Sequence, residues 1–312
     1  MSMRIALMMP GQGSQYVGMG VELCSAYPAV ARLYEEADEI LGFSLSRLCR
    51  EGPEEDLRRT QNAQPAILLH SIAVWSTLPP DVRSSVVVAA GHSLGEFSAW
   101  LAAGSFSVGE ALRTVRRRGE LMAMSGAERP GTMAAVLGLE PEIVSRVCAD
   151  VPEGECVPAN FNAPGQIVIS GDVPAVEAAC AGALRAGARK AVPLNVSGAF
   201  HSPLMRTARE GLRVALAGVE MSAPAFPIVA NAAAVPVTDP ETGRELLVEQ
   251  LTSPVRWVES VGAMEGFKPD LWVELGPGAV LTGLLRRIER RRPVATAGSP
   301  DEIAALVEAF HG

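Results

Sequence analysis

The sequence predicts an α/β protein built on a parallel sheet with helices on both faces, into which a smaller α+β unit is inserted. Apolar runs typical of strands alternate with helical patterns in residues 1–128, and the alternation resumes in residues 199–312. Residues 129–198 instead follow the order strand, helix, strand, strand, helix, strand, which is the ferredoxin-like motif. The sequence therefore predicts a large domain in two segments, 1–128 and 199–312, and a small subdomain, 129–198.

Periodicity and turn residues place the elements of the large domain. A short buried strand at 4–9 enters the turn PGQGSQ at 10–15, and a β-branched run starting at Val86 forms a second strand. Thr60 or Asn62 is expected to cap a helix at 65–78. The further expected elements are helices at 27–41, 94–103, 108–124, 203–216, 245–251 and 280–287, and strands at 227–230 and 271–275, the last followed by a Gly-Pro-Gly turn at 276–278.

The small subdomain shows shorter elements in a different order. Asp172 stands before the second helix and is expected to cap it. The expected elements are strands at 132–139, 156–161, 166–170 and 190–196, and helices at 141–149 and 173–186.

Composition restricts the class of protein. The 312 residues are 48% hydrophobic and 20% charged, which predicts a globular protein with a sizeable core. Neither an apolar run of about 18 residues nor a signal peptide is found, so we expect no membrane contact and a cytoplasmic location. The net charge of −8 argues against nucleic acid as a partner, and nothing demands more than a monomer.

Cysteine and histidine usage argues against metal chemistry. The five cysteines are scattered without a CxxC pair, which favours reduced thiols over a disulfide framework. With four histidines and no HExxH motif, we expect no catalytic metal and no cofactor.

The most informative stretch is the strand starting at Val86 and the Gly-x-Ser-x-Gly pentapeptide that follows it. A strand, this pentapeptide and a helix in direct succession are typical of a nucleophile elbow, which would raise Ser93 above the sheet. Gly91 and Gly95 fit the close approach of backbone in such a turn. The helix starting near Leu94 would offer free N–H groups to a developing oxyanion.

A serine nucleophile needs a base, and His201 is the best of the four histidines. His70 fits a packed helix position, His311 a fraying tail, and the side chain of His92 should diverge from that of its neighbour Ser93. His201 stands where the chain leaves the small subdomain, a place where clefts form. From spacing alone, a loop histidine bonded to backbone is an equally good interpretation.

No acid residue stands where a Ser-His-acid triad would need it. Between Ser93 and His201 no Asp ends a convincing strand. Either a backbone carbonyl orients the histidine, or the site is not of the Ser-His-acid type.

Two further residues are candidates for the site. Arg118 falls near the centre of the apolar stripe of the helix 108–124, and Arg117 falls furthest from it. A buried arginine suits a carboxylate, although Arg118 could also reach solvent or pair with a structural Glu. Gln12 could bring an oxyanion donor beside Ser93, or its turn could be purely structural.

Taken together, the motifs resemble those of the malonyl-CoA:acyl carrier protein transacylases and the acyltransferase domains of polyketide synthases. The resemblance covers nearly the whole chain, and Met9 stands where Phe is usual in the family. The motifs are PGQGSQ at 10–15, TQNAQPA at 60–66, GHSLGE at 91–96, RRGELM at 117–122, NAPGQIVISG at 162–171, GAFHS at 198–202, SPVRW at 253–257 and ELGPGAVLTGL at 274–284.

The resemblance implies an α/β-hydrolase-like domain with a ferredoxin-like insert, and it implies roles for individual residues. Ser93 would form the acyl-enzyme with His201 as general base, and Arg118 would bind the malonyl carboxylate. Gln12 and the N–H of Leu94 would form the oxyanion hole, and the carbonyl of Gln250 would orient the histidine. Gln64, Asn162, Phe200 and Met122 would line the cleft, with Phe200 favouring malonyl over substrates with an α-methyl group.

The implied activity is that of an acyltransferase. It would carry malonyl from malonyl-CoA to the phosphopantetheine thiol of acyl carrier protein by a ping-pong reaction. The carrier protein would dock on basic residues, for which Arg189, Lys190, Arg286, Arg287, Arg290, Arg291 and Arg292 are candidates. A polyketide acyltransferase, a malonate decarboxylase subunit and a serine esterase or thioesterase remain as alternatives.

Overall fold

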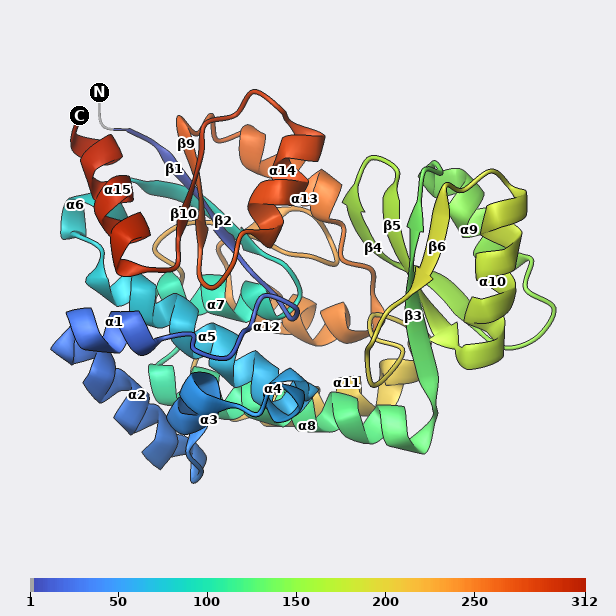
Figure 1. The fold of residues 1–312 in the computed structure, drawn as a ribbon, viewed down its shortest axis with the longest axis horizontal. Coiled ribbons are helices and arrows are strands. Elements are labelled where there is room, and N and C mark those ends of the chain that lie inside the picture. The colour runs from blue at the N-terminus through green and yellow to red at the C-terminus, as the bar shows by residue number, and fades with distance from the viewer. Residues whose placement is uncertain (1–2) are drawn as a thin grey trace.

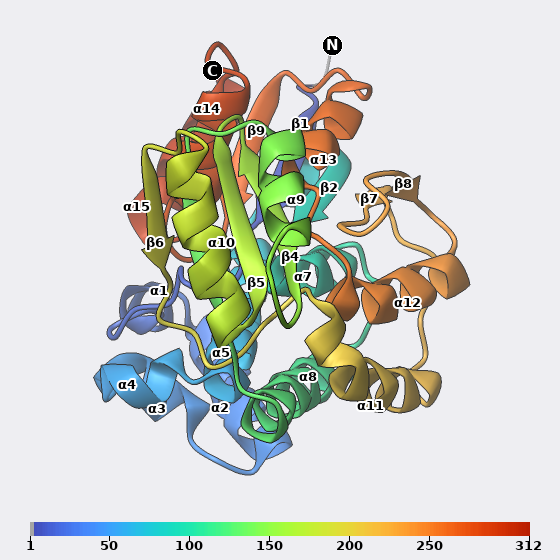
Figure 2. The same ribbon diagram turned by 90° about the vertical axis from the view of Figure 1, so that its right-hand side faces the viewer.

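The computed structural model describes residues 3–312, which form a larger and a smaller sheet with helices around them (Figure 1). The strand order is β10-β9-β1-β2-β7-β8 in the larger sheet and β4-β5-β3-β6 in the smaller one. The smaller sheet, with its own helices α9 and α10, lies beside the larger unit, and Figure 2 shows it facing the viewer. The α/β fold class predicted from the sequence is confirmed.

The larger sheet is parallel except at its β7–β8 edge. All five residues of β1 are buried, as expected for a strand covered on both faces. Met9 at the end of β1 pairs with Gly91 at the end of β2, so the two following loops meet. The strands are β1 (Ile5–Met9), β2 (Val86–Gly91), β7 (Ile228–Val229), β8 (Pro236–Val237), β9 (Leu271–Leu275) and β10 (Val294–Ala297).

Helices cover both faces of this sheet (Figure 1). None of them, within residues 3–312, is long and apolar enough to cross a membrane. They are α1 (Val21–Ala26), α2 (Pro28–Leu41), α3 (Leu45–Glu51), α4 (Glu54–Arg58), α5 (Thr60–Thr77), α6 (Pro80–Ser84), α7 (Leu94–Ala102), α8 (Val108–Glu128), α11 (Arg206–Ala217), α12 (Pro240–Glu249), α13 (Trp257–Glu265), α14 (Val280–Ile288) and α15 (Pro300–His311), with the 3-10 turns η1 (Pro203–Met205) and η2 (Gln250–Thr252).

The predicted start of α5 was wrong. The helix begins at Thr60, so Pro65 lies inside it, and no side chain caps it. A proline inside a helix leaves the carbonyl four residues earlier without its N–H partner. That carbonyl belongs to Gln61 and accepts a hydrogen bond from Arg116 Nη1 at 3.1 Å instead.

The smaller sheet joins neighbouring strands in antiparallel pairs, as the ferredoxin-like prediction requires. Its elements are β3 (Gly131–Leu137), α9 (Pro141–Ala149), β4 (Cys156–Ala163), β5 (Gln166–Asp172), α10 (Val173–Arg185) and β6 (Lys190–Pro193). Asp172 stands before α10, but its side chain does not cap the helix and pairs with Arg129 at 2.8 Å. The exact boundaries of this subdomain stay a prediction.

A short seam joins the smaller sheet to the larger unit. Strand β4 bonds to the segment after η2, where the Phe161 N–H donates to the Val255 carbonyl at 2.9 Å. The Val255 N–H in turn donates to the Ala159 carbonyl at 2.8 Å. The backbone after η2 is thus bonded to the subdomain strand.

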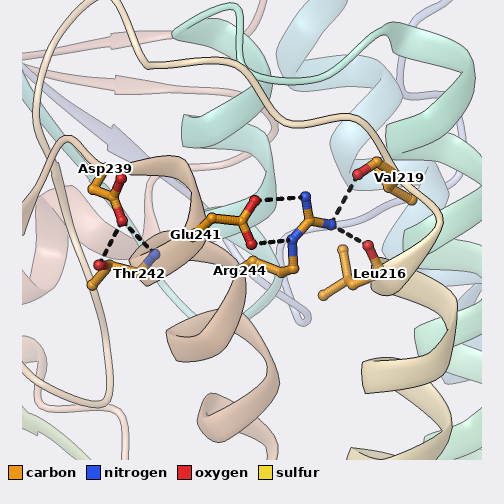
Figure 3. A network of polar contacts seen from close by, with 6 residues as sticks. All are labelled: Leu216, Val219, Asp239, Glu241, Thr242 and Arg244. Carbon is orange, nitrogen blue, oxygen red and sulfur yellow. Dashed lines mark hydrogen bonds and ion pairs between the residues drawn. The ribbon is translucent and has the colours of Figure 1, made fainter.

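The helix that leads into η2 is fixed at its other end by an arginine (Figure 3). Arg244 of α12 donates from Nη1 to the carbonyl of Leu216 in the last turn of α11 and to that of Val219 just after it, the latter at 2.9 Å. Carbonyls at a helix C-terminus lack N–H partners further along the helix, so a guanidinium binds there readily. Glu241 holds the guanidinium from its other side, and Asp239 caps α12 by accepting from the Thr242 N–H at 2.8 Å. Together these contacts join α12 to α11.

A buried histidine in the core makes the fold sensitive to acid. His70 of α5 contacts the Gly298 carbonyl from Nε2 at 2.9 Å and the Tyr34 hydroxyl from Nδ1 at 3.4 Å. Because a carbonyl only accepts, Nε2 carries the proton and Nδ1 is the acceptor. Burial lowers the pKa of His70 from 6.5 to about 4.

We expect this histidine to cost stability on acidification. The unfolded chain binds the His70 proton below its ordinary pKa while the folded chain does not, so stability is lost as pH falls from about 6.5 toward about 4. Between about pH 7 and about pH 5 the loss amounts to about 2 kcal/mol. Urea unfolding of the wild type and of His70→Gln at both pH values measures it, and the variant should lose less stability than the wild type. Equal losses would contradict this assignment.

Candidate active site

Ser93 stands on a strained turn between β2 and α7. Its φ of 52° is in the left-handed region, which side chains rarely adopt. The turn is held by close backbone approach, since a Cβ on Gly95 would lie 2.0 Å from the Met9 carbonyl oxygen. A Cβ on Gly91 would meet the backbone of Gly95 at 1.8 Å. Only glycine fits at these two positions, and the tightness forces the serine side chain out of the turn.

His201 faces the serine from the start of the second large-domain segment. The Nε2 atom of His201 lies 2.8 Å from Ser93 Oγ. The Nδ1 atom lies 2.9 Å from the carbonyl of Gln250 and 3.2 Å from that of Ser253. Carbonyls only accept, so the proton is on Nδ1 and the lone pair of Nε2 faces the hydroxyl. This is the tautomer that a general base needs.

The environment keeps this histidine neutral. Burial is the main cause that lowers the pKa of His201 to about 3, and the positive charge of Arg118 is the second. The hydrogen bonds to the two carbonyls act in the opposite direction and raise it. A base with a depressed pKa remains unprotonated, and able to accept the serine proton, throughout the neutral pH range.

Arg118 is buried and lies beside the serine. It is 1% exposed, whereas the side chain of its neighbour Arg117 is 49% exposed, in agreement with the apolar stripe of α8. Its Nη1 donates to Gln64 Oε1 at 2.7 Å, and its Nη2 donates to Gln250 Oε1 at 2.7 Å and to Ser93 Oγ at 3.1 Å. Its Nε has no partner among the described residues. Arg118 also lines the cavity beside the serine, where an anionic group could meet its guanidinium.

A buried polar cluster lies beneath the serine, formed by Glu96, Asn231 and Gln250. Asn231 accepts from the Ser93 N–H on Oδ1 at 2.7 Å and donates to the Gly91 carbonyl at 2.7 Å. Glu96 Oε2 accepts from the Asn231 N–H at 3.0 Å and from Gln250 Nε2 at 2.7 Å. These bonds hold both sides of the strained turn.

Glu96 and Asn231 were not among the residues predicted to form the site, although each has a signal in the sequence. Glu96 is an acidic residue inside the otherwise apolar helix α7. Asn231 follows β7 at the carboxyl end of a parallel sheet, where binding residues gather.

The same contacts show which N–H groups near the serine are free. The Ser93 N–H is already bonded to Asn231, so it is not free for a ligand. The N–H of Leu94 is the first of α7 and has no carbonyl within the helix to bond. Gln12 lines the same cavity, with its side-chain amide donating to Thr60 Oγ1 at 3.3 Å.

Ser93 and His201 open into a cavity of about 480 Å³ between the two sheets. Asn162, Phe200 and Met122 line it as the resemblance implies, but Gln64 does not, because it lies behind Arg118 and is bonded to it. His92 does not bond to the serine, yet it also lines the cavity and contacts Asn162 Oδ1 from Nε2 at 2.8 Å. The oxygen of Asn162 is thereby occupied, and its NH₂ group is left for a ligand.

Comparison with known proteins agrees with this geometry. The family model described as an acyl transferase domain matches residues 7–309. The malonyl CoA-acyl carrier protein transacylase of Bacillus subtilis is 43% identical, over 98% of this chain and 96% of the relative. The protein of that name from Escherichia coli is 40% identical, over 98% of this chain and 99% of the relative.

Solved structures give the same result. An acyl-carrier-protein S-malonyltransferase from Bartonella henselae superposes with a TM-score of 0.95 at 42% identity, over 99% of this chain and 100% of that one. A malonyl-transacylase in complex with a type II polyketide synthase acyl-carrier protein superposes with a TM-score of 0.93 at 38% identity, over 98% and 99% of the two chains. This chain belongs to the acyl transferase family and, within it, to the malonyl CoA-acyl carrier protein transacylases.

Proposed function

We propose that this chain transfers malonyl from malonyl-CoA to the phosphopantetheine thiol of an acyl carrier protein, with Ser93 as the nucleophile. The observation that carries the proposal is the contact between Ser93 and Arg118. The guanidinium of Arg118 lies 3.1 Å from the serine hydroxyl and lines the same cavity. An acyl group with a free carboxylate can therefore bond to Arg118 while its other end reacts with Ser93.

In the proposed first half-reaction, Ser93 attacks the thioester carbonyl while His201 Nε2 takes the hydroxyl proton. The N–H of Leu94 and a donor from Gln12 stabilise the oxyanion, and one such donor is worth roughly 3–4 kcal/mol. The tetrahedral intermediate collapses to malonyl-serine, and the CoA sulfur leaves with the proton that the histidine gives back. The second half-reaction reverses these steps, with the thiol of the carrier protein attacking the ester.

In this proposal two backbone carbonyls orient the histidine, in place of the acidic residue of a Ser-His-acid triad. The carbonyls of Gln250 and Ser253 hold the tautomer without adding a negative charge to the cleft. A carboxylate in that position would repel the malonyl carboxylate, whereas a carbonyl does not carry a full charge.

Mass spectrometry of the intact protein tests the proposal directly. After brief mixing with malonyl-, methylmalonyl- and acetyl-CoA in competition, we expect a malonyl adduct that disappears when holo carrier protein is added. Ser93→Ala should form no adduct because it lacks the nucleophile. Accumulation of free acid and CoA without transfer would instead show that water reaches the acyl-enzyme, which is the hydrolase alternative.

The docking surface for the carrier protein is a separate proposal. Arg189 and Lys190 are exposed at the start of β6, and Arg286 and Arg287 are exposed at the end of α14. Of the second pair, Arg287 already bonds to Gln166, so its charge is less available to a partner.

Charge reversal at Arg189 and Lys190 tests this surface. If an acidic carrier protein docks there, the double change to glutamate should raise KM for the carrier protein and leave KM for malonyl-CoA unchanged. Steady-state kinetics with each substrate varied in turn measures both values. A parallel rise of the two KM values would mean that the carrier protein docks elsewhere.

The proposed reaction takes place in the cytoplasm and needs no cofactor besides the phosphopantetheine of its partner. All five cysteines are free thiols, which supports a reducing compartment. Fatty acid synthesis is the proposed pathway, and a polyketide pathway would use the same chemistry.

A further inference from the structure

Glu96 is a buried carboxyl group that the proposed mechanism does not use. It is 0% exposed and lies on α7 directly beneath Ser93. Oε2 accepts two hydrogen bonds, while Oε1 lies near the Trp100 indole without a hydrogen bond of ordinary geometry. A buried carboxyl group costs stability unless something compensates it, so its presence under the nucleophile calls for an explanation.

The contacts link this carboxyl group to Arg118 through one amide. Gln250 Nε2 donates to Glu96 Oε2 at 2.7 Å and to the Ser93 carbonyl at 3.1 Å. The other end of the amide, Oε1, accepts from Arg118 Nη2 at 2.7 Å. Rotating the amide by half a turn would place donor against donor at Arg118 and acceptor against acceptor at Glu96. Glu96 thus helps, together with the Ser93 carbonyl and Arg118 itself, to fix which end of Gln250 faces the arginine.

We propose that Glu96 is a positioning residue for the malonyl carboxylate: it orients the Gln250 amide toward Arg118 and serves as the counter-charge of Arg118 until the substrate carboxylate arrives. The inference rests on the malonyl transfer proposed above. With the substrate in place, two carboxylates share one guanidinium, so Glu96 takes up a proton. The unbonded Oε1 can carry that proton without breaking either bond to Oε2.

The electrostatics of the site agree with this exchange. Burial raises the pKa of Glu96 to about 7. The Asn231 N–H, the Gln250 amide and the charge of Arg118 act in the opposite direction and lower it. Burial also disfavours the charged form of Arg118 and lowers its pKa to about 10, whereas the negative charge of Glu96 raises it. The groups that face Glu96 are Trp100 on its own helix, Arg118 on α8, Asn231 after β7 and Gln250 in η2, and Arg118 is the charged one among them.

The coupling predicts a specific pH dependence. An ionised Glu96 competes with malonyl for Arg118, so KM for malonyl-CoA should rise as pH increases through about 7, whereas kinetics with acetyl-CoA should not follow this ionisation. Linkage makes the effect reciprocal, and typical coupling between sites corresponds to about fivefold or more in affinity.

Two variants separate charge from orientation. Glu96→Gln keeps an oxygen for Gln250 but has no charge, so its KM for malonyl-CoA should lose the pH dependence and lie about fivefold below that of the wild type at about pH 8. Glu96→Leu keeps the volume but removes the acceptor, so its kcat/KM should fall more for malonyl-CoA than for acetyl-CoA. Glu274→Gln is the matched control, because Glu274 is also fully buried but caps α14 away from the cavity.

Titration calorimetry supplies a second readout without turnover. Binding of malonyl-CoA to Ser93→Ala near pH 7 should take up protons, seen as a heat that depends on the buffer, and adding Glu96→Gln should abolish the uptake. If the wild type forms a malonyl-Ser93 adduct, unchanged proton uptake or an unchanged pH profile of KM in Glu96→Gln would overturn the inference. Equal losses for the two substrates in Glu96→Leu would assign the residue a purely structural role. If the wild type forms no malonyl-Ser93 adduct, the proposed function fails and this inference fails with it.

Discussion

Arg118→Ala should lose malonyl transfer and gain activity on acetyl-CoA relative to malonyl-CoA. Removing one partner of a buried ion pair costs about 3–5 kcal/mol, so kcat/KM for malonyl-CoA should fall by at least about a hundredfold. The acetyl group has no carboxylate that Arg118 could bind, so kcat/KM for acetyl-CoA should change far less. Competition between the two CoA thioesters, read as the ratio of acetyl to malonyl adducts on Ser93, measures the change.

The neighbouring Arg117 provides the control for this prediction. It is on the same helix with its side chain 49% exposed, and it lies 3.7 Å from Glu120, so Arg117→Ala removes a charge without touching the cavity. It should leave the ratio of adducts unchanged. A ratio that stays the same in Arg118→Ala as well would refute the carboxylate-binding role.

His201→Ala should slow acylation of Ser93 by about 10²- to 10⁴-fold, the usual contribution of a general base. The serine would keep its contact with Arg118 but lose the acceptor for its proton. Rapid-quench measurement of the malonyl adduct gives the acylation rate separately from binding. In the wild type this rate should show no loss as pH falls through 6.5, because the pKa of His201 is lowered to about 3.

Another buried histidine serves as the comparison. His70→Gln changes a histidine of similar burial that lies outside the cavity. At neutral pH the acylation of Ser93 in this variant should therefore proceed at the wild-type rate. A small loss in His201→Ala, close to that of His70→Gln, would show that the base is a different group.

Local sequence patterns predicted much of this molecule. The elbow was predictable because its cause is local: two glycines around a serine, after a β-branched strand and before a helix. The place of Arg118 on the apolar face of α8 was predictable because it depends only on the helical period, whereas the pattern left open whether its guanidinium reaches solvent. The helix α5 was misplaced because Pro65 is a good first residue of a helix, while the compensating bond from Arg116 comes from a residue far away in the chain.

The polar cluster beneath the serine lay beyond such reasoning. Glu96 is more than a hundred residues away from Asn231 and Gln250 in the chain, and meets them only through the topology of the sheet. Spacing alone likewise left His201 open, because the carbonyls that orient it come from the segment after α12. Every residue has a backbone carbonyl, so no side-chain motif in the sequence can indicate which carbonyl orients the histidine.

The seam at Val255 has a consequence for how the molecule moves. The bonds between β4 and Val255 are made two residues after Ser253, whose carbonyl contacts the histidine. A movement of β4 relative to the larger sheet would therefore also displace the segment that carries the Ser253 carbonyl. The spacing of the two sheets and the orientation of the histidine ring would thus be mechanically linked.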